Sequence, residues 1–321
     1  MNSKHSFKEE IVHLTHADLD ALGSMLNLHY ITPNTKKTTF HTNYKDLSEK
    51  VHEVLEYIRK HHIKMLVISD IAFTSNKSDL LELQRVVQDE MGINIMYFDH
   101  HVYEDGFFDN ITFKYIHNIE YSATMIMNKA FKIQDKHLIN LSNMINIFDI
   151  WKESSDLFLI SLELNDWFYN EMKTKSFDKI ACEIINNDYK LPSSFVGYVK
   201  QHQFECKTKL QSLKDRGLFV NDGFTSMIFT DDFINQALYE TFNKDKNKVA
   251  LIVNSYGIIR IRFSTIDCLS DKEKEKIKLA IMGKLDIGHL NAFSLKVENS
   301  NFEKLMGKVQ EIINIININK P

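Results

Sequence analysis

The stretch INIMYFDHH (residues 93–101) joins an apolar run to one aspartate and two histidines. A short apolar run flanked by polar sequence is typical of a buried strand. Asp99, His100 and His101 follow this run directly. The sequence therefore predicts a strand over residues 93–98 that ends in side chains able to bind a metal ion or to move a proton.

Two earlier apolar runs end in the same way. Residues 11–15 (IVHLT) are followed by His16, Asp18 and Asp20, and residues 64–69 (KMLVIS) are followed by Asp70. In open parallel sheets, ligands bind beyond the carboxyl ends of the strands, which share one edge. The recurrence predicts one site at that edge, and Asp149, after an apolar helical run, is a further candidate acid.

Strands and helices alternate through the first half of the chain, which predicts a parallel sheet covered by helices. The other elements expected there are a strand at residues 37–42 and helices at residues 21–30, 47–61, 78–91, 122–131 and 137–148.

Residues 166–213 are polar and helical in pattern, with no strong strand. A second domain is expected from near Gly217, with strands at residues 226–230, 249–253, 258–264 and 293–297 and helices at residues 271–282 and 302–316. The predicted domains are residues 1–165, a helical connector at 166–216, and a smaller mixed α/β domain at 217–321.

The chain has 321 residues and a net charge of −4. Proteins that grip long nucleic acids usually carry a basic surface, so binding of long DNA is not expected. Cys182, Cys206 and Cys268 lie far apart, which argues against a disulfide framework or a structural zinc site. The N-terminus has no apolar run typical of a signal peptide, and no stretch approaches the about 20 apolar residues of a membrane span. We therefore expect a soluble cytoplasmic protein, monomeric or homodimeric.

Carboxylates and imidazoles are common ligands of Mn²⁺, and two such ions about 4 Å apart can activate water and clamp a phosphate for in-line displacement. The candidate ligands are His16, Asp18, Asp20, Asp70, His100 and Asp149. Other roles are open for single residues. Each of the first three aspartates can cap or begin a helix, and either histidine of the pair can be a hydrogen-bonded structural residue. Their convergence on one sheet edge favours the metal site.

Four segments resemble the motifs of the DHH phosphoesterase superfamily: THADLDALGS (15–24), VISD (67–70), FDHH (98–101) and NIFDIW (146–151). The spacing of the first motif is similar to that of the exonuclease branch and of nanoRNase B-like oligoribonucleases. In the second half, GIIRIRFS (257–264) resembles the arginine strand of the DHHA1 domain, and GKLDIGHLNAFSLKV (283–297) resembles its GGGH motif. That motif reads Asp286-Ile287-Gly288-His289 here, so two of its glycines are replaced.

The resemblance implies an N-terminal α/β domain with a five-stranded parallel sheet and a smaller mixed α/β DHHA1-like domain. It implies two Mn²⁺ ions, with Mg²⁺ or Co²⁺ as alternatives. The implied ligands are His16 and Asp18 for one ion, Asp20, His100 and Asp149 for the other, and Asp70 as the bridge. His101 would act at the leaving group as a general acid or transition-state stabiliser, and Asp99 would orient the neighbouring imidazoles. The implied contacts to substrate are Arg260, Arg262, Gly288 and His289.

The leading hypothesis is a phosphodiesterase or exonuclease that converts short oligonucleotides to mononucleotides. A first alternative is hydrolysis of a small phosphorylated nucleotide, such as a cyclic or linear dinucleotide signal or 3′-phosphoadenosine 5′-phosphate. Pyrophosphate is less favoured, because no cluster of basic residues lies near the second-domain motif. A second alternative is a non-catalytic protein that binds and sequesters a nucleotide. The aromatic residues Tyr97, Tyr103, Phe263 and Phe293 can stack on bases, although their place in apolar strands favours the core.

Overall fold

The computed structural model describes residues 10–217, 219–230, 248–264, 269–283, 292–297 and 302–319. The chain divides into two compact units. The first comprises residues 1–150 and 168–192, and the second comprises residues 151–167 and 193–321. The domain boundaries expected near residues 165 and 216 remain a prediction.

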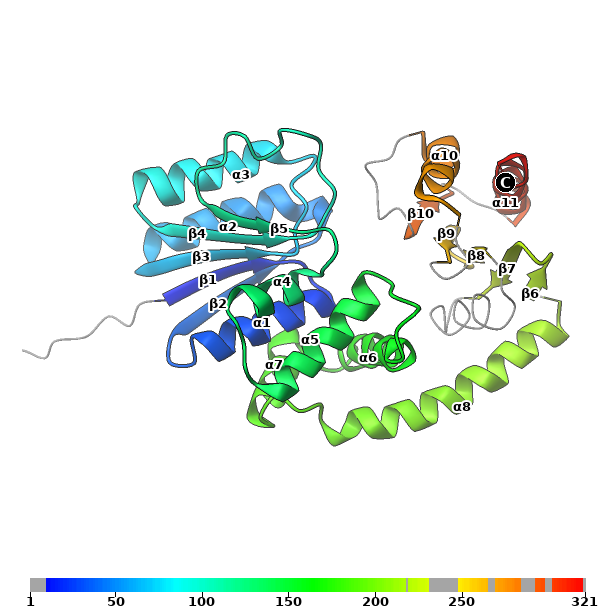
Figure 1. Cartoon of the computed structure of the whole chain (residues 1–321), viewed down its shortest axis with the longest axis horizontal. Helices are drawn as coiled ribbons and strands as arrows, with labels where there is room; N and C mark the ends of the chain where they lie inside the picture. The colour runs from blue at the N-terminus through cyan, green and yellow to red at the C-terminus, as the bar shows by residue number, and fades with distance from the viewer. Residues whose placement is uncertain are drawn as a thin grey trace, which may run out of the picture. The chain divides into compact units, whose positions relative to one another are not determined.

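The first unit contains a five-stranded sheet in the order β2-β1-β3-β4-β5, with every neighbouring pair parallel (Figure 1). The strands are β1 (Glu10–Thr15), β2 (Lys36–His41), β3 (Ile63–Ser69), β4 (Asn94–Asp99) and β5 (Lys114–His117). The predicted five-stranded parallel sheet is therefore confirmed. Its fifth strand, β5, was absent from the predicted elements, because it is short and half of its residues are exposed.

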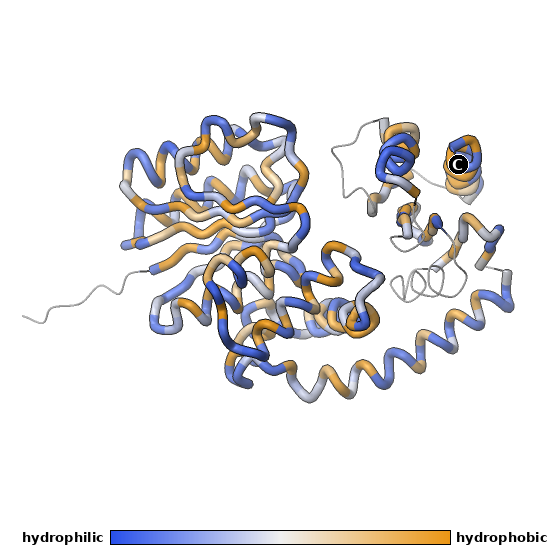
Figure 2. The backbone as a smooth tube through the Cα atoms, in the orientation of Figure 1, coloured by the Kyte–Doolittle hydropathy of each residue, from blue (hydrophilic) through white to orange (hydrophobic). Residues whose placement is uncertain are grey.

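Helices cover both faces of this sheet (Figure 1). On one face, α2 (Leu47–Lys60) and α3 (Lys77–Leu83) pack against alternate residues of the central strands, such as Val12 and Leu14. On the other face, α1 (Leu19–Ile31) and α4 (Ala123–Ala130) pack against the intervening residues. Since both faces are buried, the central strands are mainly apolar, with buried polar residues such as His13 as exceptions, and Figure 2 shows them as mainly hydrophobic.

Several shorter elements complete the first unit. After α3 the chain continues as a π-helical segment, Gln84–Glu90, and a 3₁₀ turn, Tyr44–Asp46, precedes α2. The remaining helices are α5 (Lys136–Asp149), α7 (Phe177–Asn186) and the second part of α6 (Phe158–Glu171), whose first part belongs to the other unit. Helix α5 packs against α1 and α4, which brings its last residue, Asp149, to the same edge as the strand ends.

Gly23 allows α1 to lie unusually close to its neighbours. A Cβ atom at this position would lie 2.3 Å from Oγ1 of Thr124 in α4 and 2.7 Å from Cδ1 of Ile145 in α5. One turn further on, Nδ2 of Asn27 donates a 2.8 Å hydrogen bond to the carbonyl oxygen of Thr124. The absence of a side chain at Gly23 therefore fixes the first turn of α1 against the start of α4.

The second unit is built on a mixed sheet in the order β10-β9-β8-β7-β6, in which only β7 and β8 are parallel. Its strands are β6 (Phe219–Asn221), β7 (Thr225–Phe229), β8 (Val249–Val253), β9 (Ile258–Phe263) and β10 (Ala292–Lys296). Helices α10 (Asp271–Met282) and α11 (Phe302–Ile318) supply the apolar side chains of its core, and α8 (Ser193–Asp215) precedes β6. The predicted smaller mixed α/β domain is confirmed, although β6 was not predicted.

In the part of the chain that the structure describes, no helix combines the length and apolar character needed to cross a bilayer. Within the same part, Cys182 is an exposed thiol and Cys206 a buried one. The third cysteine, Cys268, lies outside the described residues.

Candidate metal centre

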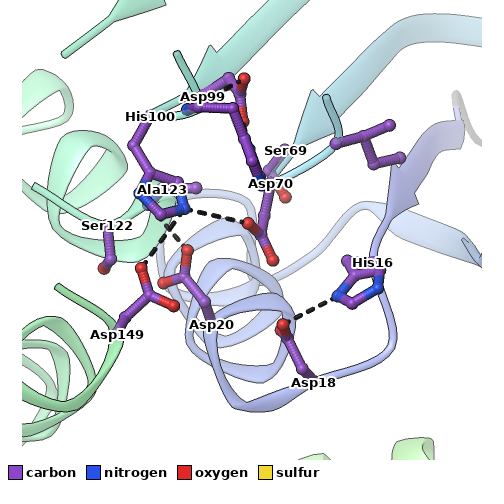
Figure 3. A network of polar contacts seen from close by, with 12 residues as sticks. His16, Asp18, Asp20, Ser69, Asp70, Asp99, His100, Ser122, Ala123 and Asp149 are labelled. Carbon is purple, nitrogen blue, oxygen red and sulfur yellow. Dashed lines mark hydrogen bonds and ion pairs between the residues drawn. The ribbon is translucent and has the colours of Figure 1, made fainter. Parts of the chain in front are cut away.

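Six predicted ligands lie together beyond the carboxyl ends of β1, β3 and β4 (Figure 3). Together with His101, these residues form three groups. Within each group the ligand atoms lie within 4.8 Å of one another, a spacing that can hold a metal ion. The groups are His16 with Asp18 and Asp70, Asp20 with His100 and Asp149, and Asp70 with His100 and His101. Asp70 and His100 each belong to two groups, so the three groups form one continuous cluster.

Asp18 combines two of the roles considered from the sequence. It is the N-cap of α1, where its Oδ1 accepts a 3.0 Å hydrogen bond from the backbone N–H of Ala21. Its Oδ2 lies 2.8 Å from Nδ1 of His16. Burial alone would raise the pKa of Asp18, but the hydrogen bond and charge of His16 prevail and lower it to about 2. One oxygen therefore fixes the helix while the other faces the cluster.

Asp20 is held from another part of the chain. Its two carboxylate oxygens accept hydrogen bonds of 2.8 Å and 3.0 Å from the backbone N–H groups of Ala123 and Thr124, in the first turn of α4. The positive end of the α4 dipole stabilises a carboxylate at this point. Burial nevertheless raises the pKa of Asp20, and the charge of Asp18 adds to the effect.

Asp70 has the clearest signs of a binding role. Its backbone has a φ of 54°, in the left-handed region that non-glycine residues rarely occupy. The side chain is 3% exposed, and Oδ2 accepts no hydrogen bond among the described residues. The following helix, α3, begins at Lys77 with Asn76 as its N-cap, so Asp70 does not cap it. A strained backbone and an unpartnered buried oxygen are both typical of a ligand position.

His100 links the acids of the cluster. Its Nε2 lies 3.3 Å from Oδ1 of Asp70 and 3.3 Å from Oδ2 of Asp149. Burial raises the pKa of Asp149 to about 8, with the charges of Asp20 and Asp18 adding to it despite the opposing charge of His100. Burial and the nearby carboxylates also raise the pKa of Asp70 well above its ordinary value.

This donor set fits divalent cations. Four closely spaced carboxylates, two of them buried and two half-buried, repel one another unless protons or metal ions neutralise them. Their formal charge matches that of two divalent ions, and oxygen with imidazole nitrogen is the ligand mixture that Mn²⁺ and similar ions accept. Without such ions the cluster must hold protons instead, which is the meaning of the raised pKa values of Asp70 and Asp149.

Asp99 and His101 form a hydrogen-bonded pair beside the cluster. Oδ1 of Asp99 lies 2.8 Å from Nδ1 of His101, and the hydroxyl of Tyr44 lies 2.8 Å from the other ring nitrogen, Nε2. Asp99 is buried, which would raise its pKa, but the charge and hydrogen bond of His101 prevail and lower it. The carboxylate therefore stays ionised and holds the imidazole in one orientation.

Tyr44 was missed by the sequence analysis. Its ring stacks on that of His16 with 5.2 Å between centroids, and 46% of the residue is exposed. It follows β2, whose carboxyl end lies at the same edge as the other strand ends. That position was the available signal, but a tyrosine in a polar loop has no distinctive pattern.

Among the aromatic candidates for base stacking, Tyr97, Phe263 and Phe293 are buried in the cores of their sheets. The core interpretation is therefore confirmed for these three. Tyr103 is half-buried, and its hydroxyl donates a hydrogen bond to Oδ2 of Asp99.

Arg260 and Arg262 lie on the same face of β9, because residues two apart in a strand point the same way and the intervening Ile259 and Ile261 face the core. Nη1 of Arg262 donates hydrogen bonds of 3.0 Å and 3.3 Å to the carbonyl oxygens of Ile261 and Phe293. Burial, together with the charge of Arg260, lowers the pKa of Arg262 to about 10.

Nη1 of Arg260 is buried and has no acceptor in the described ranges. This part of β9 therefore favours an anion. The other two predicted substrate residues, Gly288 and His289, lie outside the described residues, as do Asp286 and Ile287.

No protein-family model and no curated protein matches the chain. Solved structures do. The pGpG-specific phosphodiesterase PggH from Vibrio cholerae matches with a TM-score of 0.58 and 14% identity, over 98% of this chain and 100% of that one. The Mn²⁺ complex of RecJ from Thermus thermophilus matches with a TM-score of 0.56 and 13% identity, over 96% of this chain and 52% of that one. The manganese-bound structure of a further RecJ exonuclease has a TM-score of 0.54 and 13% identity, and the match covers 95% of this chain and 90% of that one.

This chain shares its fold with the RecJ and PggH structures. Within this fold, the four motif segments fall at the β1–α1 turn, the end of β3, the end of β4 and the end of α5. These are the positions from which the clustered side chains project (Figure 3).

Proposed function

We propose that this protein is a metal-dependent phosphodiesterase that hydrolyses short oligonucleotides to mononucleotides with two divalent ions, Mn²⁺ foremost. The observation that carries the proposal is the six-ligand cluster at the carboxyl edge of the parallel sheet, with the Asp99–His101 pair beside it. We expect it to act in the cytoplasm, as a monomer or homodimer.

In this proposal, His16, Asp18 and Asp70 would hold one ion, and Asp20, His100 and Asp149 the other. Asp70 would serve both, since its Oδ1 is 3.3 Å from His100 while Oδ2 is free to bind. When bound, two divalent ions would lower the pKa of a water molecule and neutralise the phosphate charge.

The residues around the cluster have separate tasks. Asp20 is fixed by the first turn of α4, so one ligand position is rigid before any ion binds. Asp99 orients the imidazole of His101 so that Nε2 points away from it. The Tyr44 hydroxyl at Nε2 marks a place where another oxygen, that of the leaving group, can sit. His101 would donate a proton to that oxygen.

Two features of the chain support a short substrate. The net charge of −4 does not favour long-strand binding. Arg260, whose buried Nη1 has no acceptor among the described residues, offers local recognition of a phosphate. RecJ and PggH are named, respectively, as an exonuclease and as a phosphodiesterase for pGpG, and both descriptions support phosphodiester cleavage.

A second candidate is the cleavage of one linear dinucleotide signal. It is favoured by the extent of the match to PggH, which spans the whole of both chains, whereas the match to Thermus RecJ covers about half of that protein.

A substrate panel with Mn²⁺ tests the proposal. The substrates are 5′-labelled RNA and DNA of two, three, five and twenty nucleotides, pGpG, a cyclic dinucleotide, 3′-phosphoadenosine 5′-phosphate and pyrophosphate. We expect turnover of the two- to five-nucleotide substrates to mononucleotides, abolished by a chelator. Cleavage of pGpG alone supports the second candidate. Two bound metal ions without turnover of any substrate contradict the proposal and leave a nucleotide-binding protein.

A further inference from the structure

A line of hydrogen bonds, buried at Tyr97 and part-buried at Tyr103, runs behind the Asp99–His101 pair. The hydroxyl of Tyr103 donates to Oδ2 of Asp99, the carboxylate oxygen that does not face His101. The hydroxyl of Tyr97 lies 2.5 Å from that of Tyr103 and 2.5 Å from the carbonyl oxygen of Ile71.

The direction of these hydrogen bonds follows from counting protons. A carboxylate only accepts, so the single proton of Tyr103 must point to Asp99. The hydroxyl of Tyr97 must then be the donor, and its two possible acceptors are the hydroxyl oxygen of Tyr103 and the carbonyl oxygen of Ile71. Burial raises the pKa of both tyrosines well above the ordinary value, so both hydroxyls keep their protons.

The ring of Tyr103 is itself fixed by packing. It stacks on Phe107 with 4.3 Å between centroids and meets His117 edge-on at 5.3 Å. Nε2 of His117 lies 2.6 Å from the backbone carbonyl oxygen of His101. The packing of its ring therefore fixes the position of the Tyr103 hydroxyl. His117, one of the rings that pack against Tyr103, also binds the backbone of His101.

The line of hydrogen bonds reaches both sides of the site. Ile71 is next to Asp70, whose backbone is left-handed, so Tyr97 holds the turn that carries the proposed bridging ligand. Tyr103 holds the carboxylate that orients His101. The two tyrosines touch each other, so the proton-donating side and the metal side share one buried support.

We infer that Tyr103, supported by Tyr97, is a positioning residue that locks Asp99 and thereby fixes the Nε2 atom of His101 towards the leaving oxygen. The inference rests on the proposed function. In that reaction, water adds to phosphorus and gives up one proton to solvent, and the bond from phosphorus to the leaving sugar oxygen breaks. This oxygen takes the Nε2 proton of the doubly protonated His101 ring, and solvent then returns a proton to that nitrogen. A misplaced Nε2 atom weakens only the proton transfer to the leaving oxygen. The loss in kcat should therefore depend on how much the leaving group needs a proton.

The test compares two leaving groups in Tyr103→Phe. With a 5′-phosphorylated dinucleotide, whose sugar alkoxide is a poor leaving group, kcat should fall about tenfold or more with little change in KM. With the p-nitrophenyl ester of thymidine 5′-phosphate, whose leaving group needs no proton, kcat should fall less than about threefold. Tyr97→Phe should give the same pattern with a smaller loss, because Tyr103 still donates to Asp99.

Tyr57→Phe is the matched control. Tyr57 also donates a hydrogen bond to a carboxylate, 2.8 Å from Oε1 of Glu10, but at the opposite end of β1. It should leave kcat unchanged with both substrates, whatever it does to the melting temperature. Equal losses of Tyr103→Phe on both substrates, or no loss with the dinucleotide, would overturn the inference.

A second readout does not depend on turnover. Side-chain ¹⁵N NMR of the metal-free protein, recorded at a pH where the ring is neutral, should show the single His101 proton on Nδ1 in the wild type and a mixture of tautomers in Tyr103→Phe. An unchanged His101 spectrum in the variant rejects the positioning role. If the wild type cleaves neither ester, the proposed function fails, and the NMR result still decides whether Tyr103 positions His101.

Discussion

Nε2 of His100 lies 3.3 Å from Oδ2 of Asp149, and both groups are held in a buried cluster with three further aspartates nearby. Burial lowers the pKa of His100, but the charges of Asp149 and Asp20 prevail and raise it. Without metal ions, these carboxyl and imidazole groups therefore hold protons, and binding of metal ions must release those protons.

The first prediction is an unusual pH dependence of stability. In the folded, metal-free protein Asp149 keeps its proton up to about pH 8, whereas an aspartate of the unfolded chain loses it near 3.8. Because the folded state binds more protons, the free energy of unfolding should fall as the pH rises through this range. The raised pKa values of His100 and His16 act in the same direction.

His13 opposes this trend in acid. Burial lowers its pKa to about 3, so its contribution is present above the ordinary value of 6.5 and is lost as the pH falls below it. The clean window is therefore about pH 7 to 8. Melting temperatures in a chelator should fall across this window, and excess Mn²⁺ should remove the fall. A metal-free melting temperature that rises from pH 7 to 8 contradicts the prediction.

The second prediction concerns Asp70→Asn. In the metal-free protein, burial and the charge of Asp18 force the Asp70 carboxyl group to take up a proton. A neutral amide avoids the cost of that protonation, and asparagine tolerates the left-handed backbone. The metal-free protein should therefore melt higher, by about 2 to 4 °C for each kcal/mol gained. Loading of both ions should weaken by at least about tenfold, because the proposed bridge is lost. Titration calorimetry and thermal melts measure the two effects, and two tightly bound ions in the variant would exclude Asp70 as the bridge.

The third prediction concerns His101→Gln. It should leave the number of bound metal ions unchanged, because the six proposed ligands remain. Turnover of a dinucleotide should fall by about 10² to 10⁴, the usual contribution of a positioned general acid. His101 also lies in one group with Asp70 and His100, so the metal count is the deciding measurement. Loss of one ion would make His101 a ligand instead.

The fourth prediction concerns Arg260→Gln. The buried Nη1 of Arg260 has no acceptor in the described ranges, so the substitution should not lower stability. If Arg260 binds a substrate phosphate, KM for a dinucleotide should rise about tenfold or more with kcat little changed, as expected for the loss of a charged hydrogen bond. Lys296→Gln, an exposed cation on the adjacent strand β10, is the control. Equal effects of the two substitutions would indicate general electrostatics rather than a contact.

Much of the fold could be predicted, because buried parallel strands are mainly apolar along their length. The predicted strand at residues 37–42 is β2 at Lys36–His41, and the predicted strand at 226–230 is β7 at Thr225–Phe229. The strands β5 and β6 were not predicted, because a short edge strand lacks the apolar run by which a buried strand is recognised. The π-helical segment Gln84–Glu90 was predicted as an ordinary continuation of a helix, since both have the same residue preferences.

The candidate site could be predicted where its residues come directly after a strand in the sequence. The clustered aspartates and histidines stand directly after apolar runs, so topology alone brings them together. The partners of these residues were not predictable. Asp20 bonds to Thr124, which is 104 positions away, and Tyr44 reaches His101 from another strand end. Such contacts depend on how α1 and α4 pack, and no local pattern encodes that.

Gly23 bears on the metal centre although it touches none of its ligands. A methyl group there would meet Thr124, and Thr124 donates its backbone N–H to Asp20. The spacing between helices α1 and α4 thus determines the position of Asp20 in the ion-binding cluster. A redesign of the ligands that leaves the sheet intact will therefore succeed only if residue 23 stays glycine.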